Sequence, residues 1–178
     1  MKRWHFLAIG LSLALVLVTV VGFLLPSNYT VERAISIDAP TEQVFSTIAN
    51  LNTWPTWSPW QKGADASLIY TFTGEAGEAG STLLWDGEQV GGGQIILTQT
   101  NPADGVFYEL LAGGQIVAKG RIKFLDKGGS RTRVGFEYTA ALGMNPMERF
   151  AGLFADGQVG PQFEAALTRL KTQLEQKR

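Results

Sequence analysis

Residues 31–60 read VERAISIDAPTEQVFSTIANLNTWPTWSPW, and they carry the strongest structural signals in the chain. Apolar and polar side chains alternate over residues 30–38, which predicts a strand because successive strand side chains point to opposite faces. Pro40 ends that strand, since it has no N–H to donate to a neighbouring strand. Apolar side chains at helical spacing then predict an amphipathic helix over residues 41–50.

Three tryptophans close the stretch. Trp54, Trp57 and Trp60 recur at every third position, with Pro55 and Pro59 between them. Two prolines so close together exclude a long regular helix. The segment is therefore predicted to turn tightly and to bring three large rings together.

The middle of the chain reads as a series of strands. In the last two, apolar positions face one way while Lys119, Arg121 and Lys123 face the other, which indicates a sheet with one covered and one solvated face. Gly120 and Gly135 lie in mid-strand and fit a strongly bent sheet. By the same period-two pattern, strands are predicted over residues 67–73, 81–86, 94–100, 106–111, 115–125 and 131–141.

The end of the chain carries a helical pattern. It begins at Pro146, and the segment DGQVGP at residues 156–161 predicts a kink or a short break. Apolar side chains from Phe163 to Leu174 then form a stripe typical of a helix packed on a sheet.

These landmarks together resemble the START-like superfamily, also called SRPBCC, and its polyketide cyclase/dehydrase-like branch. The resemblance covers about residues 31–174 and implies an α+β helix-grip fold. In that fold a curved antiparallel β-sheet wraps around a long C-terminal α-helix, with a hydrophobic cavity between them. The fold alone does not imply an activity, because it hosts carriers, cyclases and other binders. The matching motifs are Val31-Glu32-Arg33, Asp38-Ala39-Pro40, Trp54-Pro55-Thr56-Trp57-Ser58-Pro59-Trp60, Arg131-Thr132-Arg133-Val134 and Gly160-Pro161-Gln162-Phe163-Glu164.

A separate apolar segment precedes this domain. Phe6 to Leu25 contains no charged residue, and about 20 helical residues span about 30 Å, the thickness of a bilayer core. A transmembrane anchor over residues 1–26 and a ligand-binding domain over 27–178 are therefore predicted. The charges of Lys2 and Arg3 predict a cytoplasmic N-terminus in a bacterial inner membrane, with the domain periplasmic or extracellular. A cleaved signal peptide is the alternative.

The chemistry open to the domain is narrow. The chain has no cysteine, and its one histidine, His5, precedes the domain. Catalytic triads with a histidine base and metal sites built from histidine or cysteine are thus excluded, and no catalytic residue, metal or cofactor is predicted. The 15 basic and 16 acidic side chains lack the positive excess of a nucleic-acid binder, so no such partner is predicted.

Aromatic side chains give the main functional indication. A curved sheet that grips a helix leaves interior space, and rings facing that space would line a site for an apolar ligand. Ordinary core packing is the alternative for any single ring. The rings predicted to line the cavity are Trp57, Trp60, Tyr70, Phe72, Trp85, Tyr108, Phe124, Phe136, Tyr138, Phe150, Phe154 and Phe163.

Three functions follow from these observations. The first is a membrane-anchored binding or carrier domain for a hydrophobic small molecule, such as a lipid, a polyketide-like aromatic or an isoprenoid. The second is a cyclase or dehydratase that uses carboxylates or the hydroxyls of Tyr70, Tyr108 and Tyr138. The third is a non-enzymatic protein-interaction domain with an apolar outer surface. The space around Phe163, open or filled, separates these possibilities.

Overall fold

The computed structural model describes residues 2–128 and 130–176, and the backbone alone for residues 2, 3, 6 and 8. Over these residues the chain forms helices at both ends, with seven strands and the short helices α2 and α3 between them. In chain order the elements are α1 (Lys2–Leu24), β1 (Asn28–Ile37), α2 (Thr41–Ala49), a 3₁₀ turn (Leu51–Thr53), α3 (Trp54–Trp57), β2 (Ile69–Thr73), β3 (Thr82–Asp86), β4 (Gly93–Asn101), β5 (Gly105–Ala112), β6 (Gln115–Asp126), β7 (Thr132–Ala141), α4 (Pro146–Gly152) and α5 (Ala155–Glu175).

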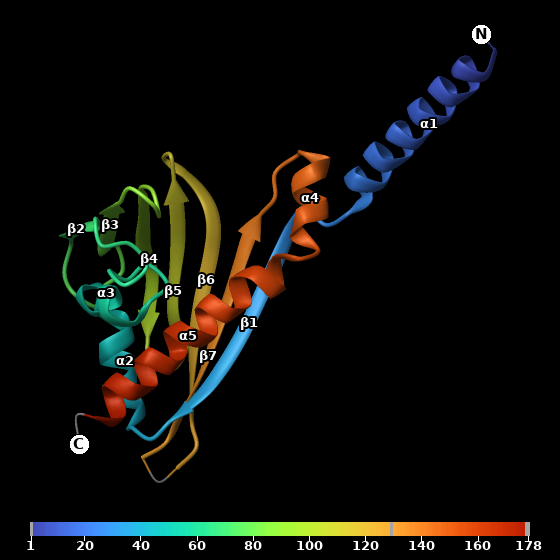
Figure 1. Cartoon of the computed structure of the whole chain (residues 1–178). Coiled ribbons are helices and arrows are strands. Elements are labelled where there is room, and N and C mark those ends of the chain that lie inside the picture. The colour runs from blue at the N-terminus through green and yellow to red at the C-terminus, as the bar shows by residue number, and fades with distance from the viewer. Residues whose placement is uncertain (1, 129, 177–178) are drawn as a thin grey trace.

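The strands form one antiparallel sheet in the order β1-β7-β6-β5-β4-β3-β2. Consecutive strands from β2 to β7 are neighbours, whereas β1 pairs with β7 at the far edge. Figure 1 shows α5 running obliquely across one face of the curved sheet, with α2 and α3 beside it. The α+β helix-grip arrangement is thus confirmed.

The core lies between this face of the sheet and α5. The alternation predicted for β6 is confirmed over its middle, where Ala118 and Ile122 are buried while Lys119 and Lys123 are exposed. On α5 the buried side chains recur at helical spacing, as the apolar stripe predicts, at Phe163, Ala166, Leu167, Leu170 and Leu174.

The prediction for residues 156–161 was a kink or a short break, and the break is wrong. Helix α5 runs through Pro161, and the chain breaks earlier, at Leu153 and Phe154 between α4 and α5. Proline at 161 removes one backbone hydrogen bond, the one its N–H would donate four residues back. The side chain of Arg33 on β1 bonds to α5 on both sides of the proline and stabilises the turn against this loss.

The apolar N-terminal segment is helical, as predicted, but its membrane role is not supported. From Trp4 to Leu24 every described side chain is exposed except at Gly22. Among the described residues, no helix combines the length and the hydropathy required to cross a bilayer. The side chains of Lys2 and Arg3, on which the predicted orientation depends, lie outside the described part of the chain.

Candidate functional site

The centre of the interior is built on one rung of the sheet. Tyr108 on β5 pairs with Gly120 on β6, which pairs in turn with Tyr138 on β7. Because Gly120 has no side chain, the ring of Tyr108 lies in the space above it, where a Cβ atom would overlap the phenol. The glycine therefore fixes where the Tyr108 hydroxyl lies.

That hydroxyl is the unusual feature of the site. Tyr108 is 1% exposed, and its hydroxyl oxygen has no hydrogen-bond partner among the described residues. Burial, and to a lesser degree the nearby Tyr138, raises the pKa of Tyr108 well above the ordinary value. The group is thus a neutral phenol with an unused donor, an arrangement that costs about 1–3 kcal/mol when a polar group is buried without a partner.

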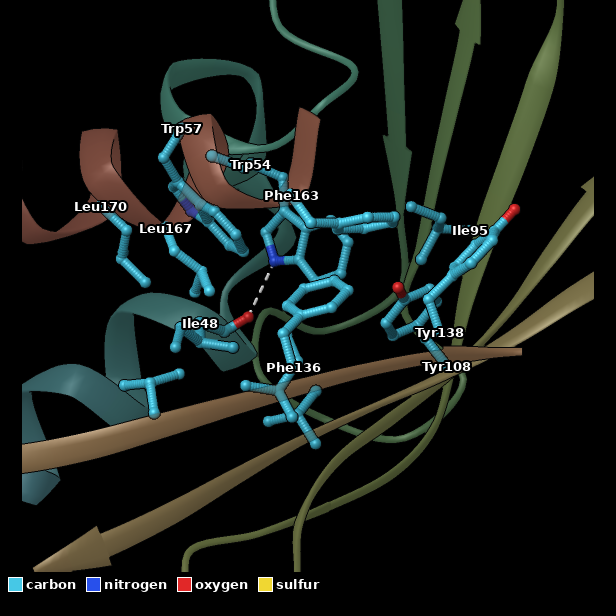
Figure 2. Packing of buried hydrophobic residues seen from close by; sticks show 14 of the residues in the cluster. Ile48, Trp54, Trp57, Ile95, Tyr108, Phe136, Tyr138, Phe163, Leu167 and Leu170 are labelled. Atoms are coloured by element: carbon cyan, nitrogen blue, oxygen red, sulfur yellow. Dashed lines mark hydrogen bonds between the residues drawn. The ribbon is translucent and has the colours of Figure 1, made fainter. Parts of the chain in front are cut away.

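Rings from β7 and α5 continue the site on one side of Tyr108. Phe163 on α5 packs on Phe136 and Tyr138, with ring centroids 4.7 Å and 5.0 Å apart, as Figure 2 shows. Burial, followed by the charge of Tyr29, raises the pKa of Tyr138 to about 12. Both interior phenols therefore stay protonated at neutral pH.

Tryptophans continue the site on the other side. Trp54 meets the ring of Tyr108 edge-on at 5.2 Å and stacks on Trp60 at 6.2 Å. Trp60 in turn contacts Trp85 at 5.4 Å. The indole N–H of Trp54 donates to the carbonyl of Ile48 at 2.8 Å, which fixes the ring at the centre of the group. The rings thus form a continuous aromatic layer from Trp85 to Tyr138.

The structure brings together most of the predicted lining residues. Tyr70 lies at the rim, where its hydroxyl donates to the Trp60 carbonyl at 2.8 Å. The half-buried Phe124 contacts Phe45 at 5.8 Å on another part of the sheet. The interior group itself comprises Trp57, Trp60, Trp85, Tyr108, Phe136, Tyr138 and Phe163.

Three predicted lining residues lie elsewhere. Phe72 is exposed because β2 is the edge strand of the sheet, and Phe154 is exposed at the break between α4 and α5. Phe150 is half-buried and lies next to Gly22 of α1. Phe163 itself is buried and packs on Phe136 and Tyr138, and the open space around it stays a prediction. A role for each ring in ligand contact stays a prediction.

Sequence reasoning missed two residues. Trp54 was placed in the turn but not in the lining, although a buried indole N–H always needs an acceptor and so marks a fixed ring. Arg33 occupies an inward position between Val31 and Ile35 on β1, and a charged side chain on an apolar strand face was the available signal.

Comparisons with known proteins agree with this architecture. Residues 29–175 match the family model described as polyketide cyclase / dehydrase and lipid transport. This match confirms the predicted superfamily. No curated protein matches the chain.

Solved structures of low sequence identity share the fold. A protein from Nitrosospira multiformis is 19% identical, with a TM-score of 0.58 over 84% of this chain and 99% of its own. The di-domain ARO/CYC StfQ of the steffimycin biosynthetic pathway is 12% identical, with a TM-score of 0.61 over 84% of this chain and 51% of its own. A norcoclaurine synthase point mutant from Thalictrum flavum, in complex with a transition state analogue, is 12% identical, with a TM-score of 0.60 over 85% and 97%.

Proposed function

The chain belongs to the polyketide cyclase / dehydrase and lipid transport family, and we propose that it binds a hydrophobic small molecule between the sheet and α5. The observation that carries the proposal is the buried Tyr108 hydroxyl without a partner. A ligand with an oxygen acceptor, such as a carbonyl, ester or ether group, would accept that hydrogen bond. The surrounding rings would contact its apolar part.

The chemistry of the two phenols favours binding over catalysis. A general acid or base works best when its pKa lies near the operating pH. The pKa values of Tyr108 and Tyr138 are both raised, so each remains a hydrogen-bond donor across the neutral range. The buried carboxylate Asp65 accepts hydrogen bonds from its own loop and from a second loop, so it is engaged structurally. A binding or carrier domain is the function that these groups support.

Ligand entry requires a path to the Tyr108 hydroxyl, because this side chain is buried in the structure. The first half of α5 is the weakest part of the cover. It contains Gly157, Gly160 and Pro161, which disfavour a helix, and its buried residues before Phe163 are Ala155 and Gly160. Regions with few buried apolar contacts open locally at low free-energy cost. We therefore place the entry between β1 and this half of α5.

A membrane location would suit such a carrier, since apolar ligands partition into lipid. An anchored domain in a bacterial inner membrane, facing away from the cytoplasm, stays a prediction of the N-terminal sequence. The binding proposal does not depend on it.

Binding can be tested with the full chain and its own tryptophans. Trp54, Trp60 and Trp85 lie in the aromatic layer, so their fluorescence should change on titration with a fatty acid, an isoprenoid alcohol or a polycyclic aromatic ketone. Tyr108→Phe removes only the unused donor and should weaken binding of the oxygen-bearing ligand about tenfold, or 1.4 kcal/mol. Tyr70→Phe, at the rim, is the matched control and should leave affinity unchanged.

Two outcomes oppose the proposal. If no member of the ligand panel binds, and mass spectrometry of the purified protein finds no copurified lipid, the interior is simply a packed core. If a ligand binds equally well to wild type and Tyr108→Phe, the site lies elsewhere or the hydroxyl has no part in it.

A further inference from the structure

The end of α1 is fixed rigidly to α4. Gly22 is buried in an otherwise exposed helix, and a Cβ atom there would lie 2.6 Å from Cβ of Pro146. Arg149 of α4 donates through Nη1 to the carbonyl oxygens of Phe23 at 2.8 Å and Leu25 at 3.2 Å. These carbonyls end a helix and lack partners within it, so the guanidinium caps α1. Helix α4 thus holds α1 at a fixed position.

Helix α4 contributes nothing buried to the domain core. None of its residues is buried, and four large apolar side chains before, within and after it are mostly exposed. The exposed fractions are 81% for Met144, 68% for Met147, 58% for Leu153 and 68% for Phe154. Several large apolar side chains exposed around one short helix are candidates for contact with a partner. We call these four residues the α4 rim.

The α4 rim continues the apolar surface of α1. Figure 1 shows α4 beside the end of α1, at the opposite end of the sheet from the loop between β6 and β7. Phe23 and Leu24 at this end of α1 are themselves 50% and 80% exposed. The guanidinium of Arg149 at this joint donates to backbone carbonyls. The joint therefore presents apolar side chains from both helices.

The distribution of apolar side chains on α1 identifies what covers them. Leu15, Val16, Leu17 and Val18 are exposed at successive steps of about 100°, which carry them around the helix. A protein groove covers one face of a helix, with anchors at i, i+3, i+4 and i+7. A helix that is apolar on every side requires an apolar surrounding instead.

From these observations we propose that the apolar end of α1 inserts into a lipid bilayer, and that the α4 rim, held next to it by Arg149 and Gly22, contacts lipid in the same leaflet. The occupant is the acyl-chain and headgroup boundary of a lipid bilayer. Long apolar side chains at this boundary gain free energy in proportion to the area they bury. This surface contacts lipid through α4 and is independent of the ligand proposed for the interior.

The chain has no cysteine, so single labels can be placed in the full-length protein. Met147→Cys and Phe154→Cys, each carrying a small environment-sensitive fluorophore, report on the α4 rim. Leu125→Cys is the matched control, because Leu125 is 54% exposed and lies in the sheet, next to the last residue of β6. Circular dichroism and thermal unfolding of each labelled protein check that the exposed substitutions leave the fold unchanged.

The labelled proteins are reconstituted in phosphatidylcholine vesicles and quenched from each side. Brominated phosphatidylcholine quenches only labels that it contacts, so it should quench the labels at 147 and 154 at least about tenfold more strongly than the label at 125. Iodide in the water should quench in the reverse order, most strongly at 125. If iodide quenches all three labels alike, the α4 rim lies in water and the proposal fails. If both quenchers are excluded from 147 and 154, a protein surface or a second copy covers the rim, which also overturns it.

Discussion

The guanidinium of Arg33 occupies the space beside Gly160 that a side chain at position 160 would need. From there its Nε donates to Glu164 at 2.6 Å, and its Nη1 and Nη2 donate to both carboxylate oxygens of Asp156 at 2.9 Å and 3.1 Å. The glycine thus allows β1 to hold α5 on both sides of Pro161. This contact closes the edge of the interior where we place ligand entry.

Alanine substitutions at two glycines of α5 should distinguish the effect of the Arg33 contact on stability from the effect of helix propensity. Gly157→Ala meets no atom within 4 Å and should raise the free energy of unfolding by about 0.5–1 kcal/mol. Gly160→Ala displaces Arg33 and should leave the protein at least about 1 kcal/mol less stable than Gly157→Ala. Urea unfolding measures both. Equal stabilisation by the two substitutions would show that Arg33 adds nothing.

Two glycines of the sheet, Gly120 and Gly135, allow a second comparison of this kind. Gly120→Ala should destabilise the protein by about 1–3 kcal/mol, because the buried ring of Tyr108 is packed on Trp54 and Phe136 and has no room to move. Gly135→Ala, in open space on the next strand, should be neutral or slightly stabilising. Thermal unfolding compares the two, and a similar loss at both positions would contradict the packing of Tyr108 on Gly120.

Because the Tyr108 hydroxyl has no partner, Tyr108→Phe should make the ligand-free protein more stable while it weakens ligand binding. Without ligand, Tyr108→Phe should raise the free energy of unfolding by about 1 kcal/mol, since it removes a buried donor without a partner. Tyr70→Phe should lower it by about 0.5–1.5 kcal/mol, because the Tyr70 hydroxyl bonds to the Trp60 carbonyl. Denaturant titrations of the ligand-free protein test both, and destabilisation by Tyr108→Phe would mean that its hydroxyl is already satisfied.

Alkaline pH should unfold the domain as its interior phenols ionise. The pKa of Tyr138 is raised to about 12, against about 10 in the unfolded chain, so the folded state holds this proton more tightly. The resulting stability is complete below pH 10 and is lost as pH rises from about 10 to 12. Phenolate absorbance and circular dichroism should change together over this window. In Tyr138→Phe the stability should fall less steeply there, and an unchanged slope would oppose this account.

Acidic pH should weaken the hydrogen bonds by which the buried Asp65 joins two loops. One of its oxygens accepts from the N–H and hydroxyl of Ser67, and the other accepts from the N–H groups of Gln89 and Val90. The hydroxyl bond from Ser67, followed by the backbone bond from Gln89, lowers the pKa of Asp65 far below its ordinary value.

Because the pKa of Asp65 is lower in the folded protein than in the unfolded chain, the stability of the protein depends on pH. The stability that this shift provides is present above the unfolded pKa of about 3.9 and is lost as pH falls below it. Asp65→Asn should therefore be less stable than wild type at pH 7, with the gap closing as the solution is acidified. Thermal midpoints measured across this range check the prediction, and a gap that is constant with pH would contradict it.

The sequence predicted the elements well because their signals are local. Period-two alternation located β6 and β7, and the stripe from Phe163 to Leu174 located the buried face of α5. Continuation of α5 through Pro161 was missed because the stabilising contact comes from Arg33, which lies far away in the chain.

The interior was harder to predict because it depends on volume. Alternation shows which face a ring is on, but whether rings such as Phe136 and Phe163 meet or leave a gap depends on the curvature of the sheet. The position of a strand in the sheet also matters. Phe72 is on the same face of β2 as the half-buried Tyr70, yet it is exposed because β2 is an edge strand with one neighbour.

Pairing of β1 with β7 has a consequence during synthesis. Strand β1 is made before its hydrogen-bonding partner, which ends at Ala141, so the edge of β1 stays unpaired until β7 has been translated. The apolar helix α1 emerges earlier still, and Pro146 and Arg149, which hold its end, are made after β7. Nascent chains of this protein therefore have a long interval in which they need protection from aggregation, and premature termination before residue 132 would yield fragments unable to close the sheet.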